Sequence, residues 1–440
     1  MKLMEASYAT LRAVRAPLLL LEEIAGARIG EAVRVVAPDG SEQAGEVLRI
    51  DSGTVLVQLF GETAGLDLPT TRVIFSDRVR RAPLAPGCVG RIFDGSFRPL
   101  DGLPPYLPER WAPVSGRPLN PTARARPEEF IETGYSAIDG LNTLVKGQKL
   151  PLFTCAGLPA REVVAGILSQ AQLAGGGAFV VVFVALGLTH QEANFYRRVL
   201  DNMAGGFVAF LNLADQAVVE RLLAPRFGLT VAEYLAFERG LDVLVLVTDM
   251  VNYCDALREV AAAREELPGR RGYPGYLYSD LASLYERAGR IRGRPGSVTL
   301  LPVVTMPEDD ITHPIPDLTG YITEGQLVLS RDLHQRGIFP PLDVLPSLSR
   351  LMQHGIGAGR TRADHRAIAN GLYRCYARGR ELRRLEAIVG RDGMLAGDRR
   401  LLDFADRFEA AFIAQSERRS VAATLDAGAA LLREFGEEGK

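Results

Sequence analysis

A turn around Gly157 has the position of a phosphate-binding loop. Residues 152–155 form an apolar run that predicts a buried strand, and residues 161–173 have the spacing of an amphipathic helix. A phosphate loop needs a glycine-rich turn between such elements, because its backbone amides then point at the phosphates. It also needs Lys and then Ser or Thr at the start of the helix.

The residues that would do the chemistry of such a loop are replaced. Thr154 and Pro159 stand at the two glycine positions, Ala160 at the lysine, and Arg161 at the metal-binding hydroxyl. Proline has no amide to donate, and alanine has no charge to neutralise the β- and γ-phosphates. Taken alone, the segment is typical of an ordinary strand–turn–helix connection.

Acidic residues follow two further apolar runs. Asp249 ends the run at 244–248, where a carboxylate could hold Mg²⁺ through water. Because many strands end in an Asp that caps the next helix, we favour the capping role. The acids at 308–310 favour a solvated turn over a metal site. The five histidines show no ligand spacing, so we expect no metal and no prosthetic group.

Composition limits the possible partners. The chain has 440 residues, 51 basic and 53 acidic side chains and a net charge of −2, which disfavours a nucleic-acid-binding protein. Its four cysteines form no CxxC pair, which indicates reduced thiols. The longest apolar run, at 178–188, is shorter than the roughly 20 residues that span a bilayer. Any role at a membrane must therefore come through partners.

The elements that must position these residues divide the chain into three parts. Short apolar stretches with Asp-Gly turns predict a small β-barrel over residues 1–80. A central α/β domain is expected over 81–345, because apolar runs at 179–186, 207–213, 243–248 and 298–304 alternate with amphipathic helices. The proline-rich stretch at 99–127 predicts an extended connection along this domain. Residues 346–440 predict a C-terminal helical bundle.

Several long segments resemble one family. They are GQKLPLF at 147–153, GLP at 157–159, TDMVNYC at 248–254, PGRRGYPGY at 268–276 and HPIPDLTGYITEGQ at 313–326. Together they are similar to the B (beta) subunits of V-type and archaeal-type rotary ATPases, over about residues 30–415. With this resemblance, the turn at 154–161 is better interpreted as a phosphate loop that has lost its function.

The resemblance implies a β-barrel, a central P-loop-NTPase-like (RecA-like) parallel sheet and a C-terminal helical bundle. Three B subunits alternate with three catalytic A subunits in a ring around a rotor shaft. The family implies a non-catalytic role for B, and Leu188 stands where catalytic relatives carry a carboxylate. Arg350 falls at the position of an arginine finger, and Tyr321 and Ser349 fall on the same nucleotide interface.

Other implied properties concern partners. ATP or ADP with Mg would lie at the A/B interface, bound mainly by the A subunit. The loop at 388–392 resembles the segment that faces the rotor shaft. A peripheral stalk, and indirectly the membrane rotor and ion channel, would complete the assembly. The chain would then be cytoplasmic and peripheral on the membrane.

Two other functions compete with this one. An autonomous hexameric ATPase of the secretion type could carry a divergent phosphate loop, but Ala160 argues against it because no lysine stands in the required place. A ring that translocates nucleic acid is disfavoured by the near-neutral charge. Proton versus sodium specificity and the direction of the reaction in the cell are not encoded in this chain.

Overall fold

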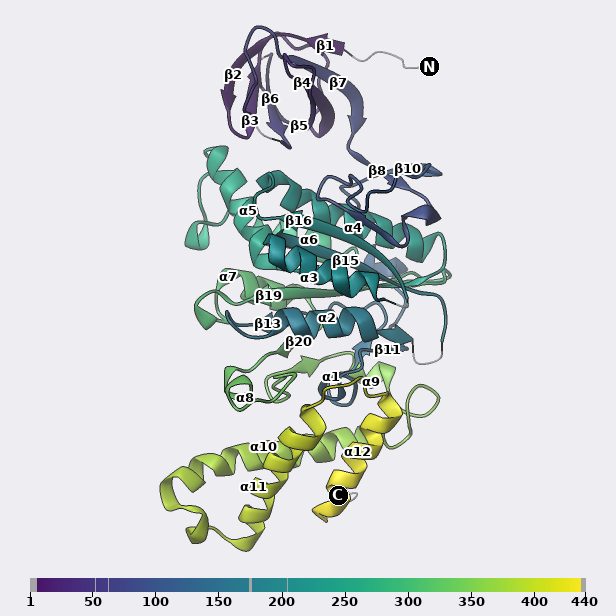
Figure 1. Cartoon of the computed structure of the whole chain (residues 1–440), viewed down its shortest axis with the longest axis vertical. Coiled ribbons are helices and arrows are strands. Elements are labelled where there is room, and N and C mark those ends of the chain that lie inside the picture. Colours follow the sequence, from purple (N-terminus) through teal and green to yellow (C-terminus); the bar gives the residue numbers. More distant parts are fainter. Residues whose placement is uncertain (1–5, 52, 62, 174–175, 204, 437–440) are drawn as a thin grey trace.

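The computed structural model describes residues 6–51, 53–61, 63–173, 176–203, 205–436. Three parts follow one another along the long axis: an N-terminal antiparallel sheet, a central α/β domain and a C-terminal group of helices (Figure 1). The predicted fold class is therefore confirmed.

The N-terminal part is a curled antiparallel sheet of seven strands. They are β1 (Ala6–Tyr8), β2 (Leu11–Arg15), β3 (Leu18–Leu21), β4 (Glu31–Val36), β5 (Glu42–Asp51), β6 (Thr54–Leu59) and β7 (Arg72–Val79). Their order in the sheet is β1-β7-β4-β5-β6-β3-β2. Alternate side chains such as Val35, Val57 and Val73 are fully buried and form its core. Gly40, with a φ of 84°, makes the predicted turn between β4 and β5.

A parallel sheet forms the centre of the molecule. Its order is β21-β20-β13-β19-β17-β15-β16-β9, and the neighbours on this path are parallel except β20 and β21. The strands are β9 (Arg91–Phe93), β13 (Leu152–Thr154), β15 (Phe179–Leu188), β16 (Gly206–Leu213), β17 (Asp242–Thr248), β19 (Ser297–Thr305), β20 (Gly325–Val328) and β21 (Leu348–Ser349); β18 (Gly289–Arg290) pairs with β19. The apolar runs predicted as strands are thus confirmed.

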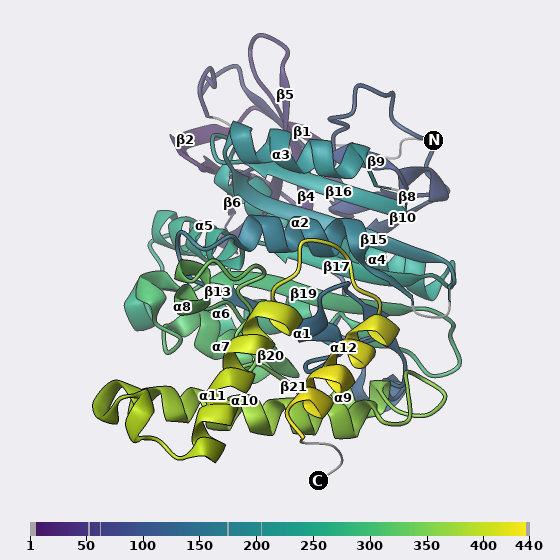
Figure 2. The same cartoon turned by 60° about the horizontal axis from the view of Figure 1, so that its bottom comes forward.

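Helices cover both faces of this sheet (Figures 1 and 2). The central helices are α2 (Ala160–Gln170), α3 (His190–Asp201), α4 (Val218–Phe237), α5 (Met250–Ala263), α6 (Leu277–Tyr285), α7 (Pro314–Ile322) and α8 (Arg331–Gln335). Along β15, Val182 packs on the side of α4 and α5, whereas Phe183 packs on the side of α2 and α3. Burial on both faces explains why β15 is apolar throughout.

Two smaller sheets surround the central one. β8 (Arg81–Leu84) pairs with β10 (Arg110–Pro113), and β11 (Phe130–Glu132) pairs with β12 (Leu144–Val145) and β14 (Gln172–Leu173). The prediction of a helix over 161–173 placed its C-terminal end three residues too late. The helix stops at Gln170 because the next residues pair with β11 as β14.

The proline-rich connection packs along the central domain, as predicted. The guanidinium of Arg124 donates to the backbone oxygens of Glu286 and Ala288, at 2.8 and 2.9 Å. The fully buried Arg287 in turn donates to the backbone oxygen of Val114 at 3.2 Å. These bonds hold an extended segment that has little secondary structure of its own.

The C-terminal part consists of α10 (His365–Val389), α11 (Ala396–Phe408), the π-helical turn η6 (Glu409–Ile413) and α12 (Val421–Glu434). Two short helices, α1 (Ser136–Asp139) and α9 (Met352–Gly355), come earlier in the chain. Gly379 of α10 lets α11 approach, because an added Cβ would meet the backbone oxygen of Leu401 at 2.6 Å. The buried Glu409 binds Arg383 of α10 at 2.7 Å and also pairs with Arg336, which follows α8. This ion network joins the helices to the central domain.

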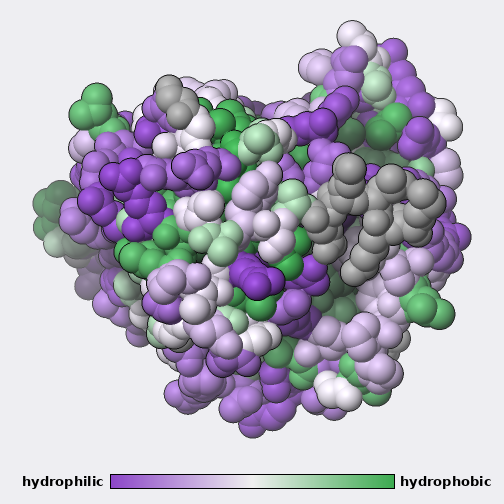
Figure 3. Space-filling model, turned by 90° about the horizontal axis from the view of Figure 1, so that it is seen from above, coloured by the Kyte–Doolittle hydropathy of each residue, from purple (hydrophilic) through white to green (hydrophobic). Residues whose placement is uncertain are grey.

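No helix among the described residues is long and apolar enough to cross a membrane. From the N-terminal end, hydrophobic residues lie scattered among more numerous hydrophilic ones (Figure 3).

Candidate functional site

The turn between β13 and α2 has the backbone path of a phosphate loop but directs its amides inward. Gly157 has a φ of 81°. The amide of Leu158 donates to the oxygen of Cys155 at 3.2 Å, and the amide of Ala160 donates to the oxygen of Leu158 at 2.8 Å. Pro159, at the N-cap of α2, has no amide. These residues therefore offer a phosphate few donors.

Arg161 does not replace the missing lysine. Its guanidinium donates to Glu162 at 2.7 Å and lies over the ring of Phe195 at 4.7 Å. The hydrogen bond with Glu162 raises the pKa of Arg161 above its ordinary value. The charge of Arg161 is thus already paired beside the loop.

A cavity of about 730 Å³ opens beside the turn, at the carboxyl ends of β13, β15, β17 and β19. This edge is where ligands bind in open α/β sheets. Its ionisable lining residues other than Cys155 and the tyrosines are Arg161, Glu192, Asp249, Asp255, Arg258, Arg271, Glu308 and His313. Arg258 pairs with Asp255 at 3.0 Å, and Arg271 pairs with Asp310 at 3.1 Å. The cavity therefore has mixed, internally paired charge.

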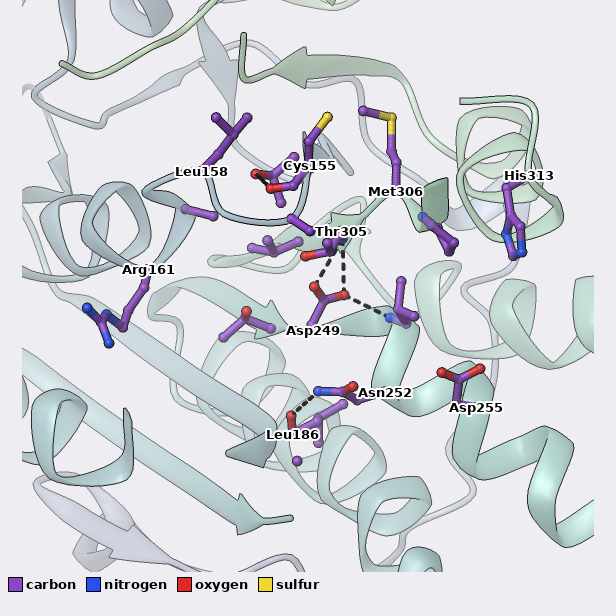
Figure 4. Close-up of a pocket in the computed structure, with 18 of the residues that line it drawn as sticks. Cys155, Leu158, Arg161, Leu186, Asp249, Asn252, Asp255, Thr305, Met306 and His313 are labelled. Carbon is purple, nitrogen blue, oxygen red and sulfur yellow. Dashed lines mark hydrogen bonds between the residues drawn. The ribbon is translucent and has the colours of Figure 1, made fainter. Parts of the chain in front are cut away.

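Asp249 acts as the predicted helix cap (Figure 4). One carboxylate oxygen accepts the amide of Val251 at 2.8 Å, and the other accepts the amide of Thr305 at 3.0 Å. Burial raises the pKa of Asp249, and the hydrogen bonds from Thr305 and Val251 oppose that shift. The carboxylate thus starts α5 and ties β17 to β19.

The lining lacks several of the groups that hold a Mg–nucleotide complex in a phosphate loop. No group of three or more His, Cys, Asp or Glu residues in the described part of the chain could hold a metal ion. Both oxygens of Asp249 accept backbone amides, and Arg161 replaces the hydroxyl that would join it on the metal. Leu188, buried at the end of β15, brings no carboxylate to this edge.

A second cavity lies at the amino end of β20, beside the outermost strand β21. This cavity of about 460 Å³ is lined by Gly320, by Gly325 and Gln326 of β20, by the segment from Leu345 to Gln353, and by side chains of α10. Arg350 is exposed on this lining, and its amide donates to the oxygen of Glu324 at 3.0 Å. Among the residues that the structure describes, no hydrogen bond or ion pair engages its guanidinium.

The two other residues predicted for this interface point in different directions. Tyr321, near the end of α7, is 75% exposed and follows the cavity-lining Gly320. Ser349 is buried, and its hydroxyl donates to the oxygen of Thr143 at 2.9 Å. The structure therefore brings Arg350 and the α7 end to one edge, while the hydroxyl of Ser349 faces the protein interior.

Sequence reasoning missed several residues of the second cavity. Asn142, Asn370 and Tyr373 line it together with Arg350. They come from segments about 200 residues apart, so no local motif could join them. The predicted site residues thus divide into two groups. Thr154, Gly157, Ala160 and Arg161 line the first cavity, with Pro159 in the same turn. Ser349 and Arg350 line the second, and Tyr321 follows its lining residue Gly320.

Family models match three consecutive parts of the chain. One described as "ATP synthase alpha/beta family, beta-barrel domain" matches residues 13–77, and one described as "ATP synthase alpha/beta family, nucleotide-binding domain" matches residues 134–349. A third, "C-terminal domain of V and A type ATP synthase", matches residues 354–440. A V-type ATP synthase beta chain from Geotalea uraniireducens (strain Rf4) is 69% identical over 439 residues, covering 100% of both chains.

The chain belongs to the V-type ATP synthase beta-chain family. A solved structure titled as a unique ATP synthase subunit NeqB from Nanoarcheaum equitans has a TM-score of 0.74 and 36% identity, and the match covers 96% of this chain and 99% of that chain. The resemblance predicted from the motifs is confirmed: this is a B subunit of a rotary ATPase, built to assemble within that complex. The V/A-type C-terminal match favours this assignment over the secretion-type ATPase.

Proposed function

We propose that this B subunit does not hydrolyse ATP in its own cavity and instead completes a nucleotide site on the neighbouring A subunit with Arg350. The observation that carries the proposal is a contrast in pairing. Arg161, beside the degenerate loop, is paired with Glu162. Arg350 is exposed at the other edge, with no guanidinium partner among the described residues.

The chemistry of phosphoryl transfer supports this role for an exposed arginine. The reaction spreads negative charge over the γ-phosphate oxygens in the transition state. A planar guanidinium donates two parallel hydrogen bonds to such oxygens, which an ammonium group cannot do. An arginine supplied by a neighbouring subunit contributes about 10³–10⁵ in rate.

The same proposal extends to cofactors and partners. ATP or ADP with Mg is bound mainly by the A subunit, and Tyr321 contributes to the same interface from its exposed position. Three A and three B subunits alternate in a ring, and the loop at 388–392 contacts the central rotor shaft. A peripheral stalk and the membrane rotor complete the complex, which holds this chain on the cytoplasmic face of the membrane. In support, Ile388 and Leu395 at this end of the helices are 81% and 76% exposed.

The test compares the isolated chain with the chain reconstituted with its A subunit. We expect no hydrolysis above background from the chain alone, and turnover from the complex. Arg350→Ala should lower turnover of the complex by about 10³–10⁵-fold, while ring assembly and nucleotide binding stay intact. Arg360→Ala, at another exposed arginine later in the chain, serves as the control and should leave turnover within a few-fold.

Two outcomes would contradict the proposal. One is turnover by highly purified chain, free of A subunit, at a rate comparable to that of the complex. The other is a normally assembled Arg350→Ala complex that still hydrolyses ATP within a few-fold of wild type. Loss of assembly by Arg350→Ala would instead assign the arginine to a structural ion pair.

A further inference from the structure

We propose that Gln148 is a positioning residue for Arg350, because its buried amide holds the hydroxyl of the preceding Ser349 and the backbone oxygen that accepts the amide of Arg350. The inference rests on the proposed function, since it gives Gln148 a role only if Arg350 acts on a nucleotide. Gln148 lies in the turn between β12 and β13 and is fully buried. A buried amide side chain is retained only if its donors and acceptor are satisfied.

The amide of Gln148 is satisfied by groups that flank Arg350. Its Nε2 donates to the Oγ of Ser349 and to the backbone oxygen of Glu324, both at 3.0 Å. Its Oε1 accepts the amide of Val145 at 3.0 Å, which anchors the side chain to its own turn. Both amide hydrogens are thus committed to the residue before Arg350, in β21, and to the residue before β20.

These contacts define the position of the Arg350 backbone. Ser349 precedes Arg350 and pairs with Gly325 across the short β20–β21 ladder. The oxygen of Glu324 that Gln148 holds also accepts the amide of Arg350 at 3.0 Å. The side chain of Gln148 therefore holds both the residue before Arg350 and the oxygen that accepts the backbone amide of Arg350.

Neighbouring groups reinforce the same arrangement. The Nζ of Lys149 pairs with the carboxylate of Glu324 at 2.8 Å and with Glu286 at 2.9 Å. The hydroxyl of Ser349 donates to the oxygen of Thr143 at 2.9 Å, so Ser349 is held twice by the loop at 143–149. The backbone of Arg350 is therefore held by several hydrogen bonds, whereas its guanidinium has no partner in the described part of the chain.

Such rigidity matters because transition-state stabilisation depends on placement. A displacement of about 1 Å in a reacting or stabilising group costs about 10²-fold in rate. Ser349 fell on the nucleotide interface by family resemblance, but its buried hydroxyl reaches Gln148 and Thr143. We therefore assign Ser349 to positioning together with Gln148, and direct contact with phosphate to Arg350 alone.

A purely structural role for Gln148 makes a different prediction, and Thr299 provides the matched control. The fully buried hydroxyl of Thr299 accepts the amide of Gly147 at 2.8 Å, in the same turn. Thr299→Val removes a buried hydrogen bond from that turn without touching Ser349 or Glu324. Any loss of activity caused only by loosening the turn should appear equally in this control.

The experiment measures single-turnover ATP hydrolysis, kcat and KM in complexes reconstituted from the A subunit and variants of this chain. Gln148→Leu should lower kcat about 10–100-fold with KM changed less than about threefold. Thr299→Val should stay within about threefold of wild type, although both variants lower the thermal midpoint. Gln148→Met, which is close in size and has no donors, replaces Gln148→Leu if that variant does not fold. Ser349→Ala should lose part of the rate, and Ser349→Thr should restore it.

A double-mutant cycle with Arg350→Ala makes the test specific. If Gln148 acts through Arg350, Gln148→Leu should cause no further loss in the Arg350→Ala background. Equal kcat losses in Gln148→Leu and Thr299→Val, or fully additive losses in the cycle, would overturn this inference alone. A complex that tolerates both Arg350→Ala and Gln148→Leu would overturn the proposed function and this inference with it.

Discussion

The degenerate loop and the Arg350 edge differ in how their charges are used. Around the loop cavity, Arg161 pairs with Glu162, and Arg258 pairs with Asp255. At the other edge, Arg350 is exposed and has no guanidinium partner in the described ranges. An arginine paired within its own chain is already neutralised, whereas an unpaired one on the surface is available to a partner. The proposed function assigns catalysis to the arginine that its own chain leaves unpaired among the described residues.

The two regions also differ in what their backbone does. At the loop, the amides of Leu158 and Ala160 donate to carbonyls within the turn. At the edge, the amide of Arg350 donates to Glu324, while its side chain stays outside this network. The loop is a strand–turn–helix connection in which these two amides are used within the turn. The edge combines a fixed backbone with a guanidinium that has no partner among the residues the structure describes.

The largest effect should come from replacing Arg350 by another cation. Arg350→Lys keeps the positive charge but loses the planar fork that binds two oxygens at once. We expect hydrolysis by the complex to fall by about 10³-fold or more, close to the loss for alanine. Steady-state turnover of assembled complexes measures this. Retention of most activity by Arg350→Lys would show that charge alone is needed and would weaken the comparison.

Replacing Asp249, the cap of α5, should lower the stability of the chain and leave turnover of the complex unchanged. In Asp249→Ala, the amides of Val251 and Thr305 lose their acceptor, which should cost about 1–3 kcal/mol in the free energy of unfolding. Asp249→Asn keeps one acceptor oxygen and should lose less. Denaturant unfolding and turnover of the complex measure the two effects. Loss of Mg²⁺-dependent nucleotide binding by the isolated chain would contradict the capping role.

Acidification should lower the free energy of unfolding through His365 of α10, the helix that lines the Arg350 cavity. The buried His365 of α10 lies 3.0 Å from the oxygen of Gly140 and 3.0 Å from the hydroxyl of Thr361. Burial lowers the pKa of His365 below its ordinary value of 6.5. The unfolded chain therefore takes up the proton first, so stability is fully present above pH 6.5 and is lost as the pH falls towards the folded-state pKa.

The measurement for His365 is the denaturation midpoint at pH 7.5 and 5.5, conditions on the two sides of about 6.5. His365→Gln cannot take up this proton and should show a smaller decrease between the two conditions than the wild type. Burial also lowers the pKa of His313, so His313→Gln measures the share of the pH dependence that comes from the loop cavity. An unchanged pH dependence in His365→Gln would contradict the assignment.

The smallest effect is expected from partial restoration of the loop. Ala160→Lys supplies a charge, but Pro159 still lacks an amide and Leu188 still offers no carboxylate. We expect no hydrolysis by the isolated variant and less than a twofold change in turnover of the complex. Hydrolysis that depends on Mg²⁺ and saturates with ATP would show that the loop region needs only one residue to work.

Much of the fold was predictable because it depends on local pattern. The apolar runs at 179–186 and 243–248 predicted strands that the structure confirms as β15 and β17. The capping role of Asp249 followed from its place between a strand and a helix. The end of α2 was not predictable, because an apolar Leu173 suits a helix as well as β14, and only its pairing with β11 decides.

The candidate site was predictable only in part. The prediction that the turn lacks phosphate-loop chemistry rests on the identities of Pro159 and Ala160 alone. The roles of Ser349 and Gln148 did not follow, because their hydrogen bond joins residues 201 apart in the sequence. β21 has only two residues, so periodicity could not tell that the side chain of Ser349 turns inward. Such contacts depend on tertiary structure.

The central claim is that Arg350 acts on a nucleotide held by a neighbour while this chain's own cavity takes no part. The most direct measurement is a structure of the complex with the A subunit, trapped with ADP, Mg²⁺ and aluminium fluoride. We predict the Arg350 guanidinium within about 3 Å of the fluoride that mimics the γ-phosphate, and no nucleotide beside Gly157. A trapped nucleotide in the cavity beside Gly157, or Arg350 paired with an acid of its own chain, would contradict the account.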